Sequence, residues 1–155
     1  MYQVQKYEQV LVPEEGKRTL SLTYVKDLVN VILQSLTISE HRNIYTVTSH
    51  PLVSIREIIK ATVKILNKKI ETVNAPSDFL MANEIKQWAD MPLWLNSDYY
   101  TYSNEKLLND FDISIIDLKT SIKQTIDYYR DLNWHQPIYG MSEDQKQLLL
   151  SKLKA

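Results

Sequence analysis

The sequence has 155 residues, of which 44% are hydrophobic and 24% charged, with a formal net charge of −1, a composition typical of one ordinary globular domain. The absence of cysteine excludes disulfide bonds and thiolate metal sites. The apolar runs are shorter than a membrane span and residues 1–9 lack the hydrophobic region of a signal peptide, so we expect a cytoplasmic protein that does not enter a membrane.

The N-terminal part of the chain predicts a strand, a turn, a second strand and a helix. Residues 10–12 are an apolar run that enters a turn at residues 13–16, where a proline fixes φ and a glycine permits a positive φ. Apolar residues alternate over residues 20–24 and then recur at helical spacing over residues 25–36. Asp27 falls in the first turn of this helix, where a carboxylate meets the positive end of the helix dipole. We therefore expect Asp27 to stabilise the start of the helix.

The middle of the chain predicts a strand, a helix and a further strand. Residues 43–48 have strand character, Ser54 and Glu57 form a capping box for a helix that ends at residue 66, and residues 70–73 form the second strand. A right-handed crossover needs about thirty residues, so we expect these two strands to pair in parallel. The predicted fold is therefore α/β, with a small, mainly parallel sheet flanked by helices.

The C-terminal half predicts three more helices separated by a loop. The helices are expected at residues 76–88, 115–132 and 143–153, and the segment 91–103 loses periodicity and is expected to be a loop. The last two helices have the capping pairs Ser114 with Asp117 and Ser142 with Gln145.

The order of these elements resembles the substrate-binding part of the extended short-chain dehydrogenase/reductases, the NAD-dependent epimerase/dehydratase family. The family's proline–glycine turn and its following Tyr-Val-Lys-Asp-Leu segment are matched by Pro13, Gly16, Tyr24, Val25, Lys26, Asp27 and Leu28. Shorter matches follow in the family's order at residues 43–49, 54–66, 92–95, 103–107 and 125–134. The resemblance implies the C-terminal lobe of an extended short-chain dehydrogenase/reductase fold. Residues 1–36 would be a junction segment that packs on a Rossmann domain, and residues 37–155 a substrate-binding lobe in the same structural unit.

The resemblance also implies a nucleotide-binding domain ahead of this chain. A dinucleotide fingerprint needs three closely spaced glycines, whereas the sequence contains only Gly16 and Gly140. We therefore assign no cofactor-binding residue to this chain, and the NAD or NADP that the family uses would belong to the missing domain.

The family's catalytic Tyr-x-x-x-Lys pattern carries little weight in this chain. Tyr2 with Lys6 and Tyr102 with Lys106 have the spacing, but ten tyrosines in 155 residues make such a match expected by chance. Members that act on nucleotide-sugars generally carry an arginine seven residues before the aspartate of the junction segment, and this position is Leu20 here. We assign no catalytic residue, and a nucleotide-diphosphate sugar is not favoured as substrate.

Aromatic side chains gather in and near the predicted loop. Flat apolar rings with polar edges suit a sugar ring or a nucleobase, and loop residues often bind ligands. The alternative is that the tryptophans anchor the loop to the core. The group comprises Trp88, Trp94, Tyr99, Tyr100 and Tyr102, of which Trp94, Tyr99 and Tyr100 are our candidate substrate-binding residues.

The three histidines, His41, His50 and His135, match no metal-ligand spacing, so we expect no metal site. His50 precedes a proline at the end of a predicted parallel strand, where open sheets place ligands. His50 is therefore the fourth candidate substrate-binding residue. Tyr24, Lys26 and Asp27 are expected to be structural residues of the junction.

Three functions remain open for this sequence. It is the substrate-binding half of an enzyme that is catalytically incomplete without a nucleotide-binding chain, a truncated product without activity, or an independent small-molecule or protein-binding module. Without a nucleotide-binding domain, apolar side chains of the helix over residues 25–36 should be exposed, so we expect a nucleotide-binding chain or a second copy to bind there. The charges form no dense basic surface, so nucleic-acid binding is not favoured.

Overall fold

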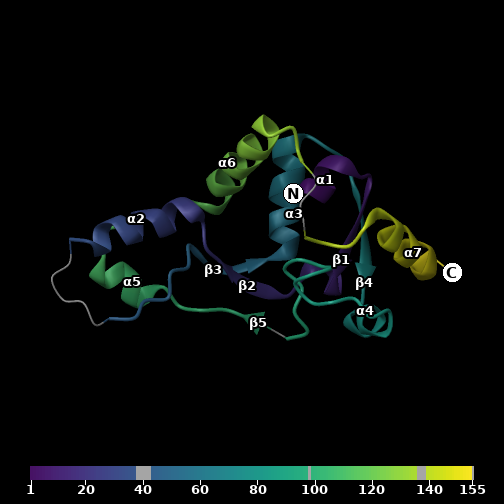
Figure 1. The fold of residues 1–155 in the computed structure, drawn as a ribbon, viewed down its shortest axis with the longest axis horizontal. Coiled ribbons are helices and arrows are strands. Elements are labelled where there is room, and N and C mark those ends of the chain that lie inside the picture. The colour runs from purple at the N-terminus through teal and green to yellow at the C-terminus, as the bar shows by residue number, and fades with distance from the viewer. Residues whose placement is uncertain (38–42, 98, 136–138, 155) are drawn as a thin grey trace.

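The computed structural model describes residues 1–37, 43–97, 99–135 and 139–154. Figure 1 shows an elongated molecule in which α2 and α5 form an arm at one end and the remaining elements form the body. In chain order, the elements are α1 (Tyr2–Lys6), β1 (Gln9–Pro13), the 3₁₀ turn η1 (Glu14–Gly16), β2 (Thr19–Leu22), α2 (Val25–Ser35), β3 (His50–Ser54), α3 (Ile55–Leu66), β4 (Glu71–Ala75), α4 (Ser77–Ala82), β5 (Tyr99–Tyr100), α5 (Glu105–Asp110), α6 (Leu118–Asp131) and α7 (Glu143–Lys154).

The strands form two small sheets. β1 pairs with β4 in parallel, and β2 lies between β3, to which it is antiparallel, and β5, to which it is parallel. Two of the three pairings among the described strands are parallel, so the prediction of an α/β fold with a mainly parallel sheet arrangement is confirmed. The strands within residues 1–36 all pair with strands from the later part of the chain.

The prediction that residues 43–48 form the strand that pairs with β4 is wrong. Residues 43–48 form no strand, and β4 pairs with β1 instead. The apolar side chains of Tyr45 and Val47 pack against Leu107 and Phe111 of the arm, so they contribute to a local core and not to a sheet.

Helix α3 begins as predicted. The Ser54 hydroxyl accepts a hydrogen bond from the Glu57 backbone N–H at 3.2 Å, and the Glu57 carboxylate accepts one from the Ser54 backbone N–H at 2.8 Å. One side of α3 contributes Ile58 to a core that contains Ile122 and Ile126 of α6. This packing fixes α6 against the body (Figure 1).

Other helix boundaries differ from the predictions. The helix predicted at residues 76–88 ends at Ala82, soon before Glu84, which has a positive φ of 57°. Helix α6 is capped by Asp117, which accepts a hydrogen bond from the Thr120 N–H at 3.0 Å, and not by Ser114. The predicted cap of α7 is present, since the Gln145 N–H donates to the Ser142 hydroxyl at 3.2 Å.

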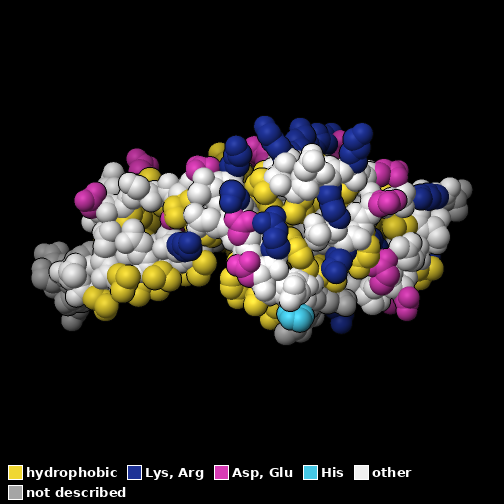
Figure 2. Space-filling view, turned by 90° about the horizontal axis from the view of Figure 1, so that it is seen from above, with side chains coloured by type: hydrophobic (Ala, Val, Ile, Leu, Met, Phe, Trp, Pro, Cys, Tyr) yellow, Lys and Arg dark blue, Asp and Glu magenta, His cyan; other side chains and the backbone are white. Residues whose placement is uncertain are grey.

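The arm has a small core of its own and an exposed apolar side. Val31 of α2 packs with Leu107 and Phe111, and each of the three side chains is at most 5% exposed. Figure 2 shows hydrophobic side chains along one edge of the arm. The exposed apolar residues of α2 and its C-cap are Val25, Val29, Ile32, Leu33 and Leu36, with exposed fractions of 61%, 48%, 50%, 60% and 76%. We call this set the α2 face.

No helix within the described ranges combines the length and the hydropathy that a membrane crossing requires.

Candidate functional site at the junction of α2 and α6

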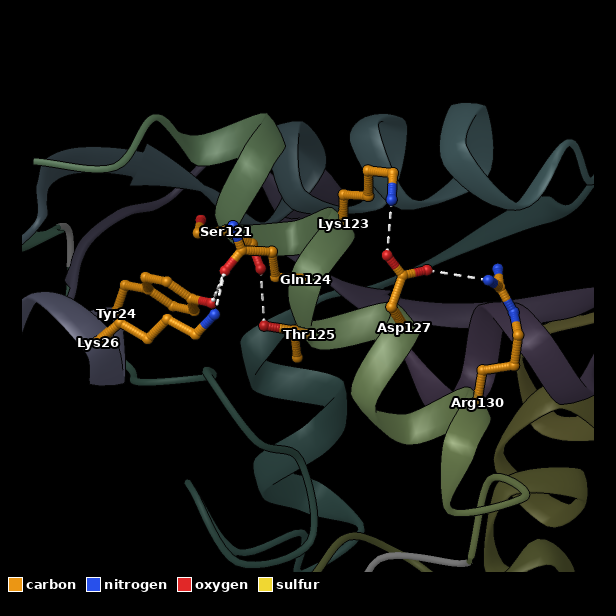
Figure 3. Close-up of polar contacts among 8 residues, drawn as sticks. All are labelled: Tyr24, Lys26, Ser121, Lys123, Gln124, Thr125, Asp127 and Arg130. Carbon is orange, nitrogen blue, oxygen red and sulfur yellow. Dashed lines mark hydrogen bonds and ion pairs between the residues drawn. The ribbon is translucent and has the colours of Figure 1, made fainter.

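The start of α2 is hydrogen-bonded to α6. β2 ends at Leu22 and α2 begins at Val25. Tyr24 and Lys26, at this transition, lie beside α6 (Figure 3). The Tyr24 hydroxyl and the Lys26 ammonium both donate to Gln124 Oε1, each at 2.7 Å. Burial, and to a lesser degree the nearby Asp27, raises the pKa of Tyr24, so its hydroxyl remains a donor at neutral pH.

Asp27 is a buried connector between α2 and the segment that leads into α6. Its side chain is 4% exposed, and its Oδ1 accepts a hydrogen bond from the Ile116 N–H at 3.3 Å. Oδ2 is buried and has no hydrogen-bond partner among the described residues. Asp27 makes no side-chain cap of α2, whose N-cap is Tyr24. Its position in the first turn still places the carboxylate at the positive end of the helix dipole, which offsets part of the cost of burial.

His50 lies in the same region, between β2 and α6. It pairs with Leu22 across β2 and β3, and its Nε2 lies 3.3 Å from the Ser121 hydroxyl of α6. Burial lowers the pKa of His50, and the carboxylates of Asp27 and Asp117 act in the opposite direction with smaller effect. The expectation that His50 ends a parallel strand is wrong, because it begins β3, which is antiparallel to β2.

Trp94 is an internal residue. Its side chain is 1% exposed, and its indole N–H donates to the Ser77 hydroxyl at 3.2 Å. Trp94 packs in the core formed by β1, α4 and α7, so it anchors the loop and offers no accessible ring face.

Both tyrosines of β5 are exposed, and Tyr100 belongs to a group of exposed aromatic side chains. Tyr99 and Tyr100 are 70% and 45% exposed. The Tyr100 ring makes edge-to-face contacts with Trp88, at 6.4 Å between ring centroids, and with Tyr102, at 5.2 Å. We call Trp88, Tyr100 and Tyr102 the aromatic surface. The cavity behind it is about 20 Å³, room for a single water molecule, so any ligand here would bind on the outside.

The candidate residues therefore form two groups along β2. His50 pairs with Leu22 at the end of β2 next to α2, whereas Tyr99 and Tyr100 pair with Thr19 and Leu20 on the opposite edge of this strand. The structure brings Tyr24, Lys26, Asp27 and His50 together but does not place them in one pocket with the aromatic surface. Sequence reasoning missed Gln124, because a glutamine on an amphipathic helix carries no signal of a contact 100 residues away.

The two Tyr-x-x-x-Lys matches do not form tyrosine–lysine hydrogen bonds. Lys6 Nζ lies over the ring of Tyr2, 5.9 Å from its centroid. Lys106 Nζ lies over the Tyr45 ring and donates to the Ile44 carbonyl at 3.1 Å, away from Tyr102. Neither arrangement would activate a phenol in the way that the family's catalytic pair requires.

Within the described part of the chain, no group of three or more His, Asp or Glu side chains is placed to hold a metal ion. His135 is exposed, and His41 lies outside the described residues.

Comparisons with known proteins identify the fold but not a family. No protein-family model matches the sequence, and the search of curated proteins found no match. The structure is similar to that of RMD from Pseudomonas aeruginosa complexed with NADPH, with a TM-score of 0.62 and 17% sequence identity. The alignment covers 85% of this chain and 39% of that chain. The chain thus shares a mixed α/β fold with part of an NADPH-bound protein, which is consistent with the predicted fold class.

Proposed function

We propose that residues 1–155 form the substrate-binding portion of an NAD(P)-dependent epimerase/dehydratase- or reductase-like protein. In this proposal the portion is catalytically incomplete on its own, and a nucleotide-binding domain supplies the cofactor site and the catalytic tyrosine and lysine. The observation that carries the proposal is the α2 face, which is the surface where such a domain would pack.

The α2 face has the pattern of a helix prepared for an interface. Its members are spaced at i, i+4, i+7, i+8 and i+11 from Val25, so they lie on one side of the helix. Burying one such side chain fully contributes about 1.5–3 kcal/mol, so a partner that covers all five would gain a large binding free energy. Contiguous exposed patches of this kind mark interaction surfaces in proteins that are otherwise well packed.

The junction residues hold this surface in a fixed position. Tyr24 and Lys26 are bonded to Gln124, and Asp27 is bonded to the backbone before α6. A docking surface tied at its base to the body loses little conformational entropy on binding. The proposed role of Tyr24, Lys26 and Asp27 is therefore to orient α2.

The proposed cofactor rests on the similar structure, and the proposed substrate rests on side chains of β2 and its neighbours. The similar structure from Pseudomonas aeruginosa contains NADPH, which supports NADP or NAD as the cofactor of the partner domain. Leu20 is 5% exposed and replaces the arginine that could bind a diphosphate, so the substrate is proposed to lack a nucleotide diphosphate. The exposed rings of the aromatic surface suit a neutral, sugar-like molecule that binds on the outside of β5.

Calorimetric titration of residues 1–155 with NADPH and with NADH tests whether the cofactor site lies outside this chain, as proposed. We expect no saturable binding, because the chain lacks the glycine-rich turn that contacts the pyrophosphate. A dissociation constant below about 100 µM, in the range of ordinary enzyme–cofactor affinities, would contradict the proposal. The coding sequence directly upstream provides the matching positive test, since the proposal expects it to encode a glycine-rich fingerprint followed by Tyr-x-x-x-Lys.

The second candidate is an independent small-molecule or protein-binding module without enzymatic activity. The exposure of Tyr99, Tyr100, Tyr102 and Trp88 favours it. A Trp88→Ala variant would then lose ligand binding while a Val29→Glu/Ile32→Glu variant keeps it, and the first proposal expects the α2 variant to lose the partner domain.

A further inference from the structure

The outer edge of β4 is open. The Glu71 N–H donates to the Glu8 carbonyl at 2.7 Å, and alternate residues of a parallel strand direct their backbone groups to the same side. The odd-numbered residues of β4 therefore bond to β1, whereas Thr72 and Asn74 direct their N–H and C=O groups away from it. Both residues are exposed, and these backbone groups have no hydrogen-bond partner among the described residues.

This edge lacks the features that usually protect an edge strand. Proteins commonly block such an edge with lysine, proline or a β-bulge. β4 contains neither lysine nor proline, and its register with β1 is regular from end to end. Side chains of α3 pack on one face of this two-stranded sheet and side chains of α7 on the other (Figure 1). The sheet is therefore supported on both faces and open along β4.

A groove that is open to solvent lies between α3 and this edge. Its volume is about 540 Å³, and Thr72 and Asn74 contribute to its lining. The volume lies within the range of binding sites for small molecules, about 300–1,000 Å³. The apolar part of the lining comprises Val12, Ile59, Val63 and Ile70. We call this space the α3 groove.

Three cationic side chains of α3 line the α3 groove. Arg56, Lys60 and Lys64 are spaced at i, i+4 and i+8, so they lie on one side of the helix. Arg56 Nη2 pairs with Glu15 Oε2 at 3.2 Å, whereas neither exposed lysine forms an ion pair with a described residue. Like charges at this spacing destabilise a helix, so an acidic partner would relieve their repulsion.

We propose that an extended, acidic segment of a partner protein adds to β4 as a further strand. Its backbone pairs with the outward N–H and C=O groups of Thr72 and Asn74, which provides affinity. Its acidic side chains face Lys60 and Lys64, which provides specificity. Every second side chain of a strand points to the same face, so the acidic residues of the segment alternate with other residues. β4 lies in the body, away from the α2 face, so this site does not depend on the proposed function.

The peptide acetyl-Glu-Val-Glu-Val-Glu-Val-amide is the probe for this site, and the same peptide with lysine in place of each glutamate is its control. In an NMR titration of the isotope-labelled chain, the acidic peptide should shift the amide signals of Thr72 and Asn74 and saturate within about 5 mM. The basic peptide should bind at least about 10-fold more weakly, because the cations of α3 repel it.

Two variants test the backbone pairing and the charge separately. Thr72→Pro removes an outward N–H but no bond to β1, and an edge strand tolerates proline at such a position. It should weaken binding of the acidic peptide about 5-fold or more. Lys64→Glu should weaken binding about 3-fold or more. Lys119→Glu is its matched control, because Lys119 is an exposed lysine of α6 outside the α3 groove, and it should leave the affinity unchanged.

The proposal is overturned by equal affinities for the two peptides, by unchanged binding to Thr72→Pro or Lys64→Glu, or by no saturable shift of the two amides up to about 5 mM peptide. It is also overturned if these amides shift when the chain alone is concentrated, since a second copy would then occupy the edge. The comparison of the two peptides uses the unchanged chain, so it is decisive even where Thr72→Pro folds poorly.

Discussion

Replacing Trp94 by phenylalanine tests whether Trp94 is a core residue or a ligand-binding residue. Trp94 is 1% exposed, and its indole N–H is bonded to the Ser77 hydroxyl, which is itself 4% exposed. Phenylalanine keeps one ring but leaves the buried hydroxyl without that donor, at a cost of about 1–3 kcal/mol. The smaller ring also leaves a void of roughly 40 Å³, which costs about 1 kcal/mol at 24 cal/mol per Å³. We therefore expect the free energy of unfolding to fall by about 2–4 kcal/mol.

The matched control is Trp88→Phe. Trp88 is 43% exposed and contacts Tyr100 edge to face, so its replacement should cost less than about 1 kcal/mol. Urea unfolding followed by far-ultraviolet circular dichroism measures both variants without relying on tryptophan fluorescence, and the slope of the transition should not change. Equal costs for the two variants would refute the assignment of Trp94 to the core.

Three further predictions concern a helix cap, a turn and a partly buried histidine. Ser54→Ala removes the hydroxyl that accepts the Glu57 N–H and should lower the free energy of unfolding by about 1 kcal/mol in urea titrations, and a change below the error would contradict the cap. Gly16→Ala should cost more than about 1 kcal/mol in the same assay, because φ is +67° and the added Cβ would lie 2.9 Å from the Arg56 backbone nitrogen. Since burial lowers the pKa of His50, the unfolded chain binds the proton first, so stability should fall as pH drops through about 6.5 and continue to fall to the lower folded-state pKa. His50→Gln should flatten that pH profile, and an unchanged profile would exclude His50 as its source.

Local patterns predicted the elements whose structure depends on near neighbours. The capping box at Ser54 and Glu57 is fully formed, because both hydrogen bonds join residues three apart. The turn at residues 13–16 and the helix that begins at Val25 also follow from local chemistry and apolar spacing. The same spacing indicated which side chains of α2 would be left exposed.

Contacts between distant residues could not be predicted in the same way. The sequence of residues 43–48 is compatible with a strand, but Tyr45 and Val47 meet α5, which lies some sixty residues further along. Trp94 is an aromatic residue in a predicted loop, which is a pattern typical of ligand binding. Only the packing of α4 and α7 determines that it is buried. Gln124 became a junction residue solely because α6 packs beside the start of α2.

Sedimentation velocity of the unchanged chain and of a Val29→Glu/Ile32→Glu variant tests whether the α2 face is a docking surface. We expect the unchanged chain to self-associate through α2 in the absence of a partner domain, and the variant to be monomeric with unchanged helix content. Leu148→Glu is the control, because Leu148 is 54% exposed on α7, and it should leave the association unchanged. If the unchanged chain is monomeric and sediments like the variant, or if Leu148→Glu abolishes association equally, the α2 face is not a docking surface.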